Sequence, residues 1–298
     1  MWWFRALQAV VLVGAAYYLV SVAAPSWPAI RDRDLAWHAA PLALSAALVL
    51  ANLALLLAAW TASLRWCAVQ VRYRDAARIW FTANLARFIP GTVWQFASLA
   101  AMGARYRVSA VAATATVLLE QIVLLITGLL LLAILTPAVS QAAWWQSALV
   151  VGAALGAAGL ILPGGAVGRW IERALPGVTS LWKGLTPGRL ALFVAVLVLP
   201  WLVYGVAFRF LAGGLLGPVA GSWGFWVAAF TGSYVAGVIA VFAPAGLLVR
   251  EAALIGVLSP VVGSGDAVIL AAASRVWLTA LEVLAAAVVL GLPAGETV

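Results

Sequence analysis

Ionisable side chains inside long apolar segments are the residues of this chain best suited to binding or proton chemistry. Glu120 and Arg275 lie within apolar stretches, and Arg250 and Glu251 follow a break in a third apolar region. A charge at the centre of a membrane helix costs about 2.5–3.5 kcal/mol on insertion scales, so it needs compensation. Two interpretations stay open: ion pairs between helices, such as Glu120 with Arg275 or Arg250, and a polar site that faces a cavity.

Two breaks of the same kind interrupt apolar runs and place polar residues at the start of a new apolar stretch. The residues concerned are Pro90, Gly91, Trp94 and Gln95 at the first break and Pro244, Gly246, Arg250 and Glu251 at the second. Proline removes a backbone donor, so freed carbonyl and amide groups need partners that lipid tails cannot supply. A helix that restarts there offers free N–H groups and a positive dipole end, which suit a phosphate or carboxylate. We therefore predict that these residues, with Glu120 and Arg275, bind the substrate, and that an anionic ligand lies near Arg250.

Polar positions recur at a constant spacing of 155 residues, which relates Gln95 to Arg250 and Glu120 to Arg275. A duplicated membrane unit explains this spacing. Three predicted crossings separate the two breaks, and an odd number inverts the second copy. Inverted repeats with broken helices are one architecture of alternating-access carriers. Ordinary kinks in duplicated helices are the alternative.

The composition requires a membrane setting, since 66% of the residues are hydrophobic, 9% are charged and the mean hydropathy is +1.12. We predict an all-α polytopic membrane protein with a single transmembrane domain over 1–298 and repeat units at about 1–137 and about 138–292. Six apolar runs are long enough to cross the roughly 30 Å hydrocarbon core. They are 6–24, 40–62, 108–136, 142–162, 190–212 and 267–292. Two re-entrant helical hairpins, at roughly 76–104 and 223–262, complete the predicted fold.

The distribution of positive charge predicts the topology. The arginine-rich segment 65–107 is expected in the cytoplasm, together with both termini. The connections 31–38, 213–222 and 259–266 carry few or balanced charges and are expected on the outer face. The chain then enters and leaves 223–262 on one side, although the first part of this segment is long enough for a full span. We expect the protein in a bacterial-type inner (plasma) membrane.

Metal and cofactor chemistry has few ligands to draw on. Cys67 is the single cysteine and His38 the single histidine, which excludes an internal disulfide and a cysteine metal cluster. The glycine-rich run 163–168 lacks the lysine of a nucleotide-binding P-loop. We therefore predict no metal, no cofactor and no nucleic-acid partner.

The residues around both breaks resemble those of a known family. The segments that carry the resemblance are Asn84-Leu-Ala-Arg87-Phe-Ile-Pro90-Gly91-Thr-Val-Trp94, Leu119-Glu120-Gln121, Pro244-Ala245-Gly246-Leu247-Leu248-Val249-Arg250-Glu251 and Ser274-Arg275. They are similar to signatures of the lysylphosphatidylglycerol synthase transmembrane-region family, and the resemblance covers about 65–290. Ala245 and Leu248 stand where that family usually has glycine. In the synthases this region is fused to a soluble aminoacyl-transferase domain, which has no counterpart here.

The resemblance implies a stand-alone flippase domain that moves a phospholipid or a lipid-linked precursor, such as an isoprenoid phosphate or a glycolipid, between leaflets. Its substrate would be an anionic or zwitterionic lipid, and Glu120 is the candidate for proton coupling. We expect no enzymatic activity. Two alternatives stay open: a membrane-embedded glycosyltransferase with Asp32 and Asp34 in an outward catalytic loop, and a non-transporting subunit that assists an enzyme of lipid or glycan biosynthesis. A biosynthetic enzyme as partner and a homo-oligomer are both compatible with the sequence.

Overall fold

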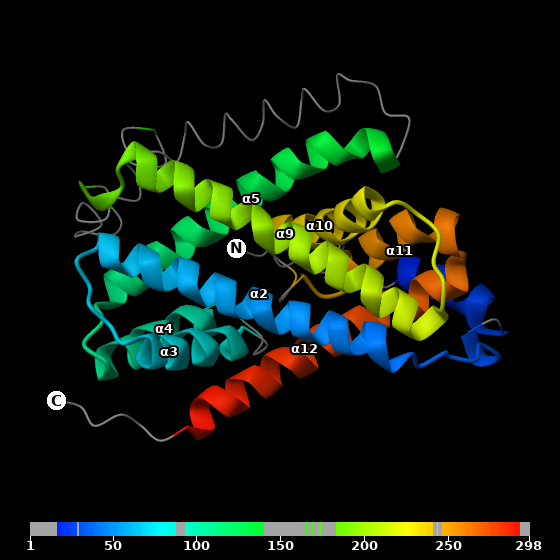
Figure 1. Ribbon diagram of the computed structural model, residues 1–298, viewed down its shortest axis with the longest axis horizontal. Helices are drawn as coiled ribbons and strands as arrows, with labels where there is room; N and C mark the ends of the chain where they lie inside the picture. Colours follow the sequence, from blue (N-terminus) through cyan, green and yellow to red (C-terminus); the bar gives the residue numbers. More distant parts are fainter. Residues whose placement is uncertain are drawn as a thin grey trace. The chain divides into compact units, whose positions relative to one another are not determined.

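The computed structural model describes residues 17–28, 30–87, 93–139, 183–240 and 246–292, together with residues 165, 169, 173 and 243. All regular secondary structure in these residues is helical (Figure 1). This confirms the all-α prediction for the part of the chain that is described.

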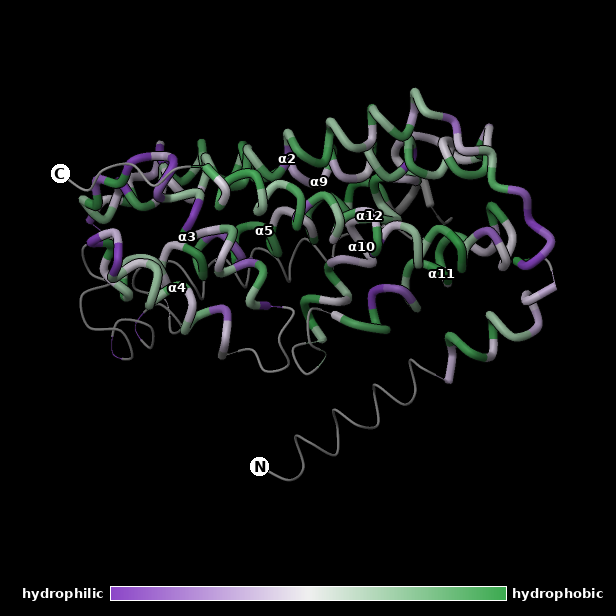
Figure 2. The backbone as a smooth tube through the Cα atoms, turned by 90° about the horizontal axis from the view of Figure 1, so that it is seen from below, coloured by the Kyte–Doolittle hydropathy of each residue, from purple (hydrophilic) through white to green (hydrophobic). Residues whose placement is uncertain are grey.

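Four long helices are apolar enough to cross a membrane. They are α2 (Ala39–Trp66), α5 (Ala110–Val139), α9 (Pro187–Leu216) and α12 (Ser264–Gly291). Figure 2 shows apolar residues along most of α2, α5 and α9. Four of the six predicted spans therefore have a matching helix. The predicted span 142–162 lies outside the described residues, and of 6–24 only the last part is described, as helix.

Two pairs of shorter helices flank the predicted breaks. The first pair is α3 (Tyr73–Ala86) with α4 (Val93–Arg105), and the second is α10 (Trp223–Ile239) with α11 (Val249–Val262). The two members of each pair pack against each other. These helices have 13 to 17 residues and rise about 20–26 Å. The helices α3, α4 and α11, with 13 or 14 residues, are shorter than a membrane crossing usually requires, whereas α10, with 17 residues, is at the lower limit.

The chain divides into two compact units, each made of three stretches of sequence. Unit 1 takes its described residues from Met1–Val49, Gly128–Gly152 and Leu199–Thr279, and unit 2 from Leu50–Thr127, Ala153–Val198 and Ala280–Val298. Each of the four long helices contributes residues to both units, whereas α10–α11 belongs wholly to unit 1 and α3–α4 wholly to unit 2. The chain thus enters and leaves each short pair within one unit. The repeat boundary near residue 137 is not tested by this division and stays a prediction.

The core of unit 1 is built from buried side chains of α9, α10, α11 and α12. Prominent members are Phe208, Leu215, Trp226, Phe230, Leu254, Leu258 and Leu270. The rings of Phe208 and Trp226 meet edge to face, with centroids 5.5 Å apart, which is a favourable geometry for aromatic pairs. This core holds α10 and α11 in place beside the second break.

The core of unit 2 surrounds the indole of Trp60, which is completely buried. Side chains of α3 cover it, among them Ile79 and Phe81. The indole nitrogen donates a 3.0 Å hydrogen bond to the Thr116 hydroxyl on α5, so the polar atom of this ring is satisfied. The core ties α3 to α2 and α5.

A single arginine bridges the two ends of the α10–α11 segment. Arg33 donates from Nε to Asp266 Oδ1 at 3.0 Å and from Nη2 to the Leu216 carbonyl oxygen at 3.4 Å. Leu216 ends α9 and Asp266 lies in the first turn of α12. The Ala36 amide also donates to the Leu215 carbonyl at 2.8 Å. The two ends of the segment therefore lie close together, and its predicted course as a re-entrant hairpin stays a prediction.

Cysteine labelling tests this arrangement in a membrane. In a Cys67→Ala background, Ala220→Cys and Ser264→Cys should both react with a membrane-impermeant maleimide from the same face, because they flank the two ends that Arg33 joins. Arg105→Cys is the comparison, and the positive-inside rule places it on the opposite face. Labelling of positions 220 and 264 from opposite faces would show that α10–α11 is a complete crossing.

The native Cys67 is expected to react only slowly with the maleimide. It follows α2 and is half-buried, and burial raises the pKa of its thiol. A raised pKa leaves less of the reactive thiolate at neutral pH. Unsubstituted protein should therefore label slowly, which provides the background measurement.

Candidate functional site

The second break sets the direction in which α11 starts. Gly246 has φ +67° and Leu248 has φ +67° with ψ −39°, so the chain turns sharply before α11 begins at Val249. Leu248 offers no side chain that caps the helix. The first amides of a helix have no partner within it. Within the described residues, the positive end of α11 therefore has no cap from the Leu248 side chain, and Arg250 lies in its first turn.

Arg250 is a buried cation with an unused donor. The residue is 8% exposed, and its guanidinium lies over the rings of Phe230 and Tyr234, 4.9 Å and 5.2 Å from their centroids. Cation–π contacts of this kind stabilise a desolvated guanidinium by about 2 kcal/mol. Nη2 of Arg250 is buried and has no hydrogen-bond partner among the described residues. The rings thus compensate part of the charge and leave hydrogen-bonding capacity for a ligand.

Glu251 and Arg275 form an ion pair beside Arg250. The distance from Arg275 Nη1 to Glu251 Oε1 is 3.7 Å, and both side chains are mostly buried. The other carboxylate oxygen of Glu251, Oε2, is buried without a hydrogen-bond partner in the described chain. Both charges lie within electrostatic range of Arg250. We call Arg250, Glu251 and Arg275 the Arg250 cluster; it carries two positive charges and one negative charge.

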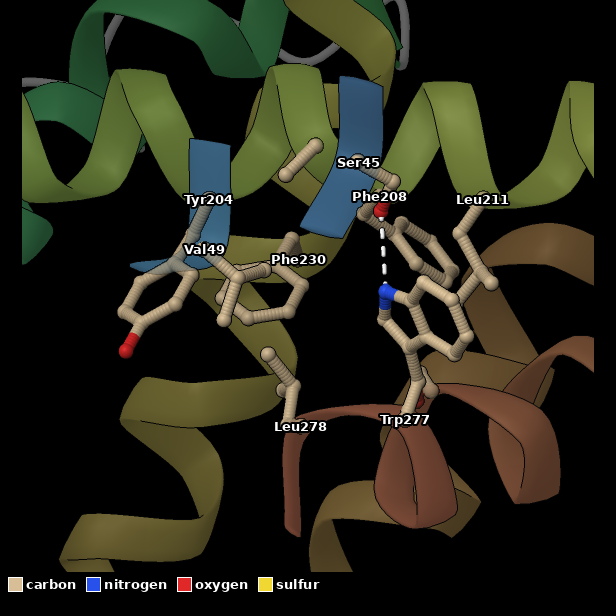
Figure 3. Close-up of a pocket in the computed structure, with 10 residues that line it drawn as sticks. Ser45, Val49, Tyr204, Phe208, Leu211, Phe230, Trp277 and Leu278 are labelled. Carbon is tan, nitrogen blue, oxygen red and sulfur yellow. Dashed lines mark hydrogen bonds between the residues drawn. The ribbon is translucent and has the colours of Figure 1, made fainter. Parts of the chain in front are cut away.

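An apolar cavity in unit 1 shares a wall with the Arg250 cluster. Ten residues from α2, α9, α10 and α12 line it, and Figure 3 shows aromatic and aliphatic side chains around it. Trp277 Nε1 donates a 3.1 Å hydrogen bond to Ser45 Oγ across one side. Phe230 lines the cavity and also packs under the Arg250 guanidinium. The apolar surroundings strengthen the electrostatic field of this cation. Sequence patterns gave no signal for the cavity.

The remaining predicted site residues belong to unit 2 or lie outside the described residues. Glu120, on α5, is 3% exposed, and its Oε1 has no hydrogen-bond partner in the part of the chain that is described. On α4, Trp94 is about half exposed and Gln95 is partly buried. The predicted residues that fall outside the description are Pro90, Gly91 and Pro244.

The structure adds an ion pair at the first break that sequence reasoning missed. Arg87 follows α3 and donates from Nη2 to Glu282 Oε2 of α12 at 2.6 Å. Glu282 is 4% exposed, and its Oε1 is buried without a hydrogen-bond partner in the described segments. Arg87 belongs to the arginine-rich segment 65–107, and no spacing in the sequence relates it to Glu282. Glu282 itself lies seven residues after Arg275 and so on the same face of α12, which is a signal that could have identified it.

The structure shows an ion pair at the second break that the sequence did not suggest. Glu251 pairs with Arg275. The Glu251 carboxylate lies on the helix that restarts after the break, and it contacts α12 from there. The pairing of Glu120 with Arg275 or Arg250 stays a prediction.

Two glycines allow α10 and α11 to approach beside the Arg250 cluster. A Cβ built on Gly246 would lie 2.9 Å from the Gly237 Cα, and one built on Gly237 would lie 3.3 Å from the Arg250 Cβ. Contacts below 3.0 Å with backbone cannot be relieved by a rotamer change. The backbone contact between Gly237 and Gly246 therefore fixes where Arg250 sits.

Alanine substitution tests this contact. Gly246→Ala should destabilise the protein by about 2 kcal/mol or more, because it adds the strain of a positive φ to the clash. A melting curve in detergent should show a fall in Tm of about 4–8 °C. Gly213→Ala is the matched control, since a Cβ there meets nothing within 4 Å. Equal Tm values for the two variants would contradict the contact.

Comparison with models of known protein families and with curated proteins found no match to this chain. The resemblance to the lysylphosphatidylglycerol synthase transmembrane region therefore rests on the quoted residues alone and stays a prediction.

Proposed function

We propose that the protein is a carrier that moves an anionic or zwitterionic lipid headgroup between the leaflets of a membrane. One observation supports this most directly: Arg250 is buried, its Nη2 atom lacks a hydrogen-bond partner among the described residues, and it lies at the uncapped N-terminus of α11. A phosphate is the group that such a helix end and guanidinium bind best.

The energetics of transfer explain why a carrier needs such a site. A phosphate taken into hydrocarbon without partners faces a penalty of order 20 kcal/mol. A protein lowers this cost when prearranged donors replace the water around the phosphate while the tails stay in lipid. Arg250, Arg275 and the free amides of α11 are donors of this kind.

We also propose how the short helix pairs are arranged in the membrane. The two short pairs would be re-entrant hairpins, one from each face, in an inverted repeat of six full spans. Broken helices in inverted repeats surround the substrate in many secondary transporters. The bridge that Arg33 makes between Leu216 and Asp266 supports the second hairpin, and the basic residues after α2 support a cytoplasmic location for the first. The likeness of both breaks to the flippase family supports the same function.

Glu120 is our proposed group for proton coupling. A buried carboxyl group with an unpartnered oxygen in a membrane helix is often part of a proton pathway. Trp94, which is about half exposed, and Gln95, both on α4, are included in the proposed headgroup path.

Substitution of Arg250 tests the headgroup site. Arg250→Gln should weaken the binding of an anionic phospholipid to purified protein by about 10- to 100-fold, because a hydrogen bond to a charged group contributes roughly 1.5–3 kcal/mol. It should also slow transbilayer movement of that lipid in proteoliposomes. Arg209→Gln is the matched control, since Arg209 also lies over an aromatic ring, that of Trp223 at 3.8 Å. Unchanged binding and movement in Arg250→Gln would refute the carrier site.

Substitution of Glu120 tests the coupling. Glu120→Gln should abolish the acceleration of lipid movement by an imposed pH gradient and leave lipid binding intact, because glutamine cannot exchange a proton. Gln121→Ala, at the adjacent exposed position, should behave as the unsubstituted protein. A gradient response that persists in Glu120→Gln would remove Glu120 from the coupling.

A further inference from the structure

The Arg250 cluster contains an unused donor and an unused acceptor on successive residues. Nη2 of Arg250 and Oε2 of Glu251 are both buried, and neither has a hydrogen-bond partner in the described part of the chain. A buried polar atom without a partner is costly, and a ligand that satisfies it recovers that cost. A ligand that fits both atoms must accept a hydrogen bond and donate one.

The charges of the cluster limit the charge of the ligand. Arg275 is paired with Glu251, which leaves the single positive charge of Arg250. The helix end adds the equivalent of about half a charge. A monoanion neutralises this site, whereas a dianion leaves excess negative charge beside the Glu251 carboxylate. Like charges repel strongly in a site of low dielectric, so the site disfavours a dianionic ligand beside Glu251.

The residues around Arg250 determine which donors of its guanidinium can bind a ligand. The rings of Phe230 and Tyr234 lie beside the group, with their centroids 4.9 Å and 5.2 Å from its central carbon. The rings offer no conventional hydrogen-bond acceptor, and Nη2 has no partner among the described residues. A guanidinium donor of this kind suits a phosphate oxygen, which it binds through a charge-assisted hydrogen bond.

From these three observations we infer that the Arg250 cluster selects a phosphodiester headgroup with one negative charge and with a hydroxyl or primary ammonium group next to the phosphate. The phosphate accepts from Arg250, and the neighbouring group donates to Glu251. Phosphomonoesters are disfavoured by their second charge, and phosphodiesters with a quaternary ammonium group are disfavoured because they have no donor. This inference rests on the proposed function and names the substrate class for it.

Headgroup competition in proteoliposomes tests the selection. Purified full-length protein in a phosphatidylcholine host is offered trace phosphatidylglycerol, phosphatidylethanolamine or phosphatidate with identical chains at pH 8, where a phosphomonoester carries nearly two charges. We expect phosphatidylglycerol and phosphatidylethanolamine to bind at least tenfold more tightly than phosphatidate or labelled phosphatidylcholine. Equal binding of phosphatidate and phosphatidylglycerol would overturn the charge argument, and equal binding of phosphatidylcholine and phosphatidylethanolamine would overturn the donor argument.

A variant separates the selection from the carrier function. Glu251→Gln removes the negative charge, and the ratio of phosphatidate to phosphatidylglycerol binding should rise at least tenfold. Glu282→Gln is the matched control, because Glu282 is also a buried, arginine-paired carboxylate but lies in unit 2; it should leave the ratio unchanged. Because a ratio is measured, partial loss of folded protein cancels. An unchanged ratio in Glu251→Gln refutes the selection while the carrier stands, and absence of binding by all headgroups refutes both.

Discussion

The structure depends on how charges inside apolar helices are compensated. Moving an ion from water into a medium of low dielectric costs many kcal/mol, and hydrocarbon offers no partner in return. The protein meets this requirement with rings of Phe230 and Tyr234 around Arg250 and with ion pairs for Glu251 and Arg87. Among the described residues the compensation at Arg250 is incomplete, because Nη2 has no hydrogen-bond partner. The proposed binding site rests on this unused donor.

The two breaks are similar in sequence but differ in how they are neutralised. At the second break the restarted helix supplies the acid, Glu251, and α12 supplies the base, Arg275. At the first break the chain supplies the base, Arg87, and α12 supplies the acid, Glu282. The second break also carries Arg250 and so keeps a net positive charge. The breaks are therefore chemically distinct, and we propose an anion site only at the second.

The helical class, the position of four long apolar helices and the place of the second break could be predicted because they follow from local properties of the sequence. The run 190–212, for example, lies within Pro187–Leu216, since apolar length alone identifies such a helix. Partners could not be predicted in the same way. In the sequence, nothing distinguishes Arg87 from the other arginines of 65–107, and its contact with Glu282 depends on where α12 packs. The apolar cavity is lined by side chains of four helices, and their spacing in the sequence shows no pattern.

The bridge between Leu216 and Asp266 has a consequence for how the chain is built into a membrane. The helices α10 and α11, with 17 and 14 residues, are shorter than the four long helices, and the start of α11 carries Arg250 and Glu251. Side chains of α9 and α12 complete the core around this pair, and Asp266 at the start of α12 binds Arg33. We therefore expect α10 and α11 to reach their folded positions only after α12, which follows them in the sequence, has been synthesised and inserted.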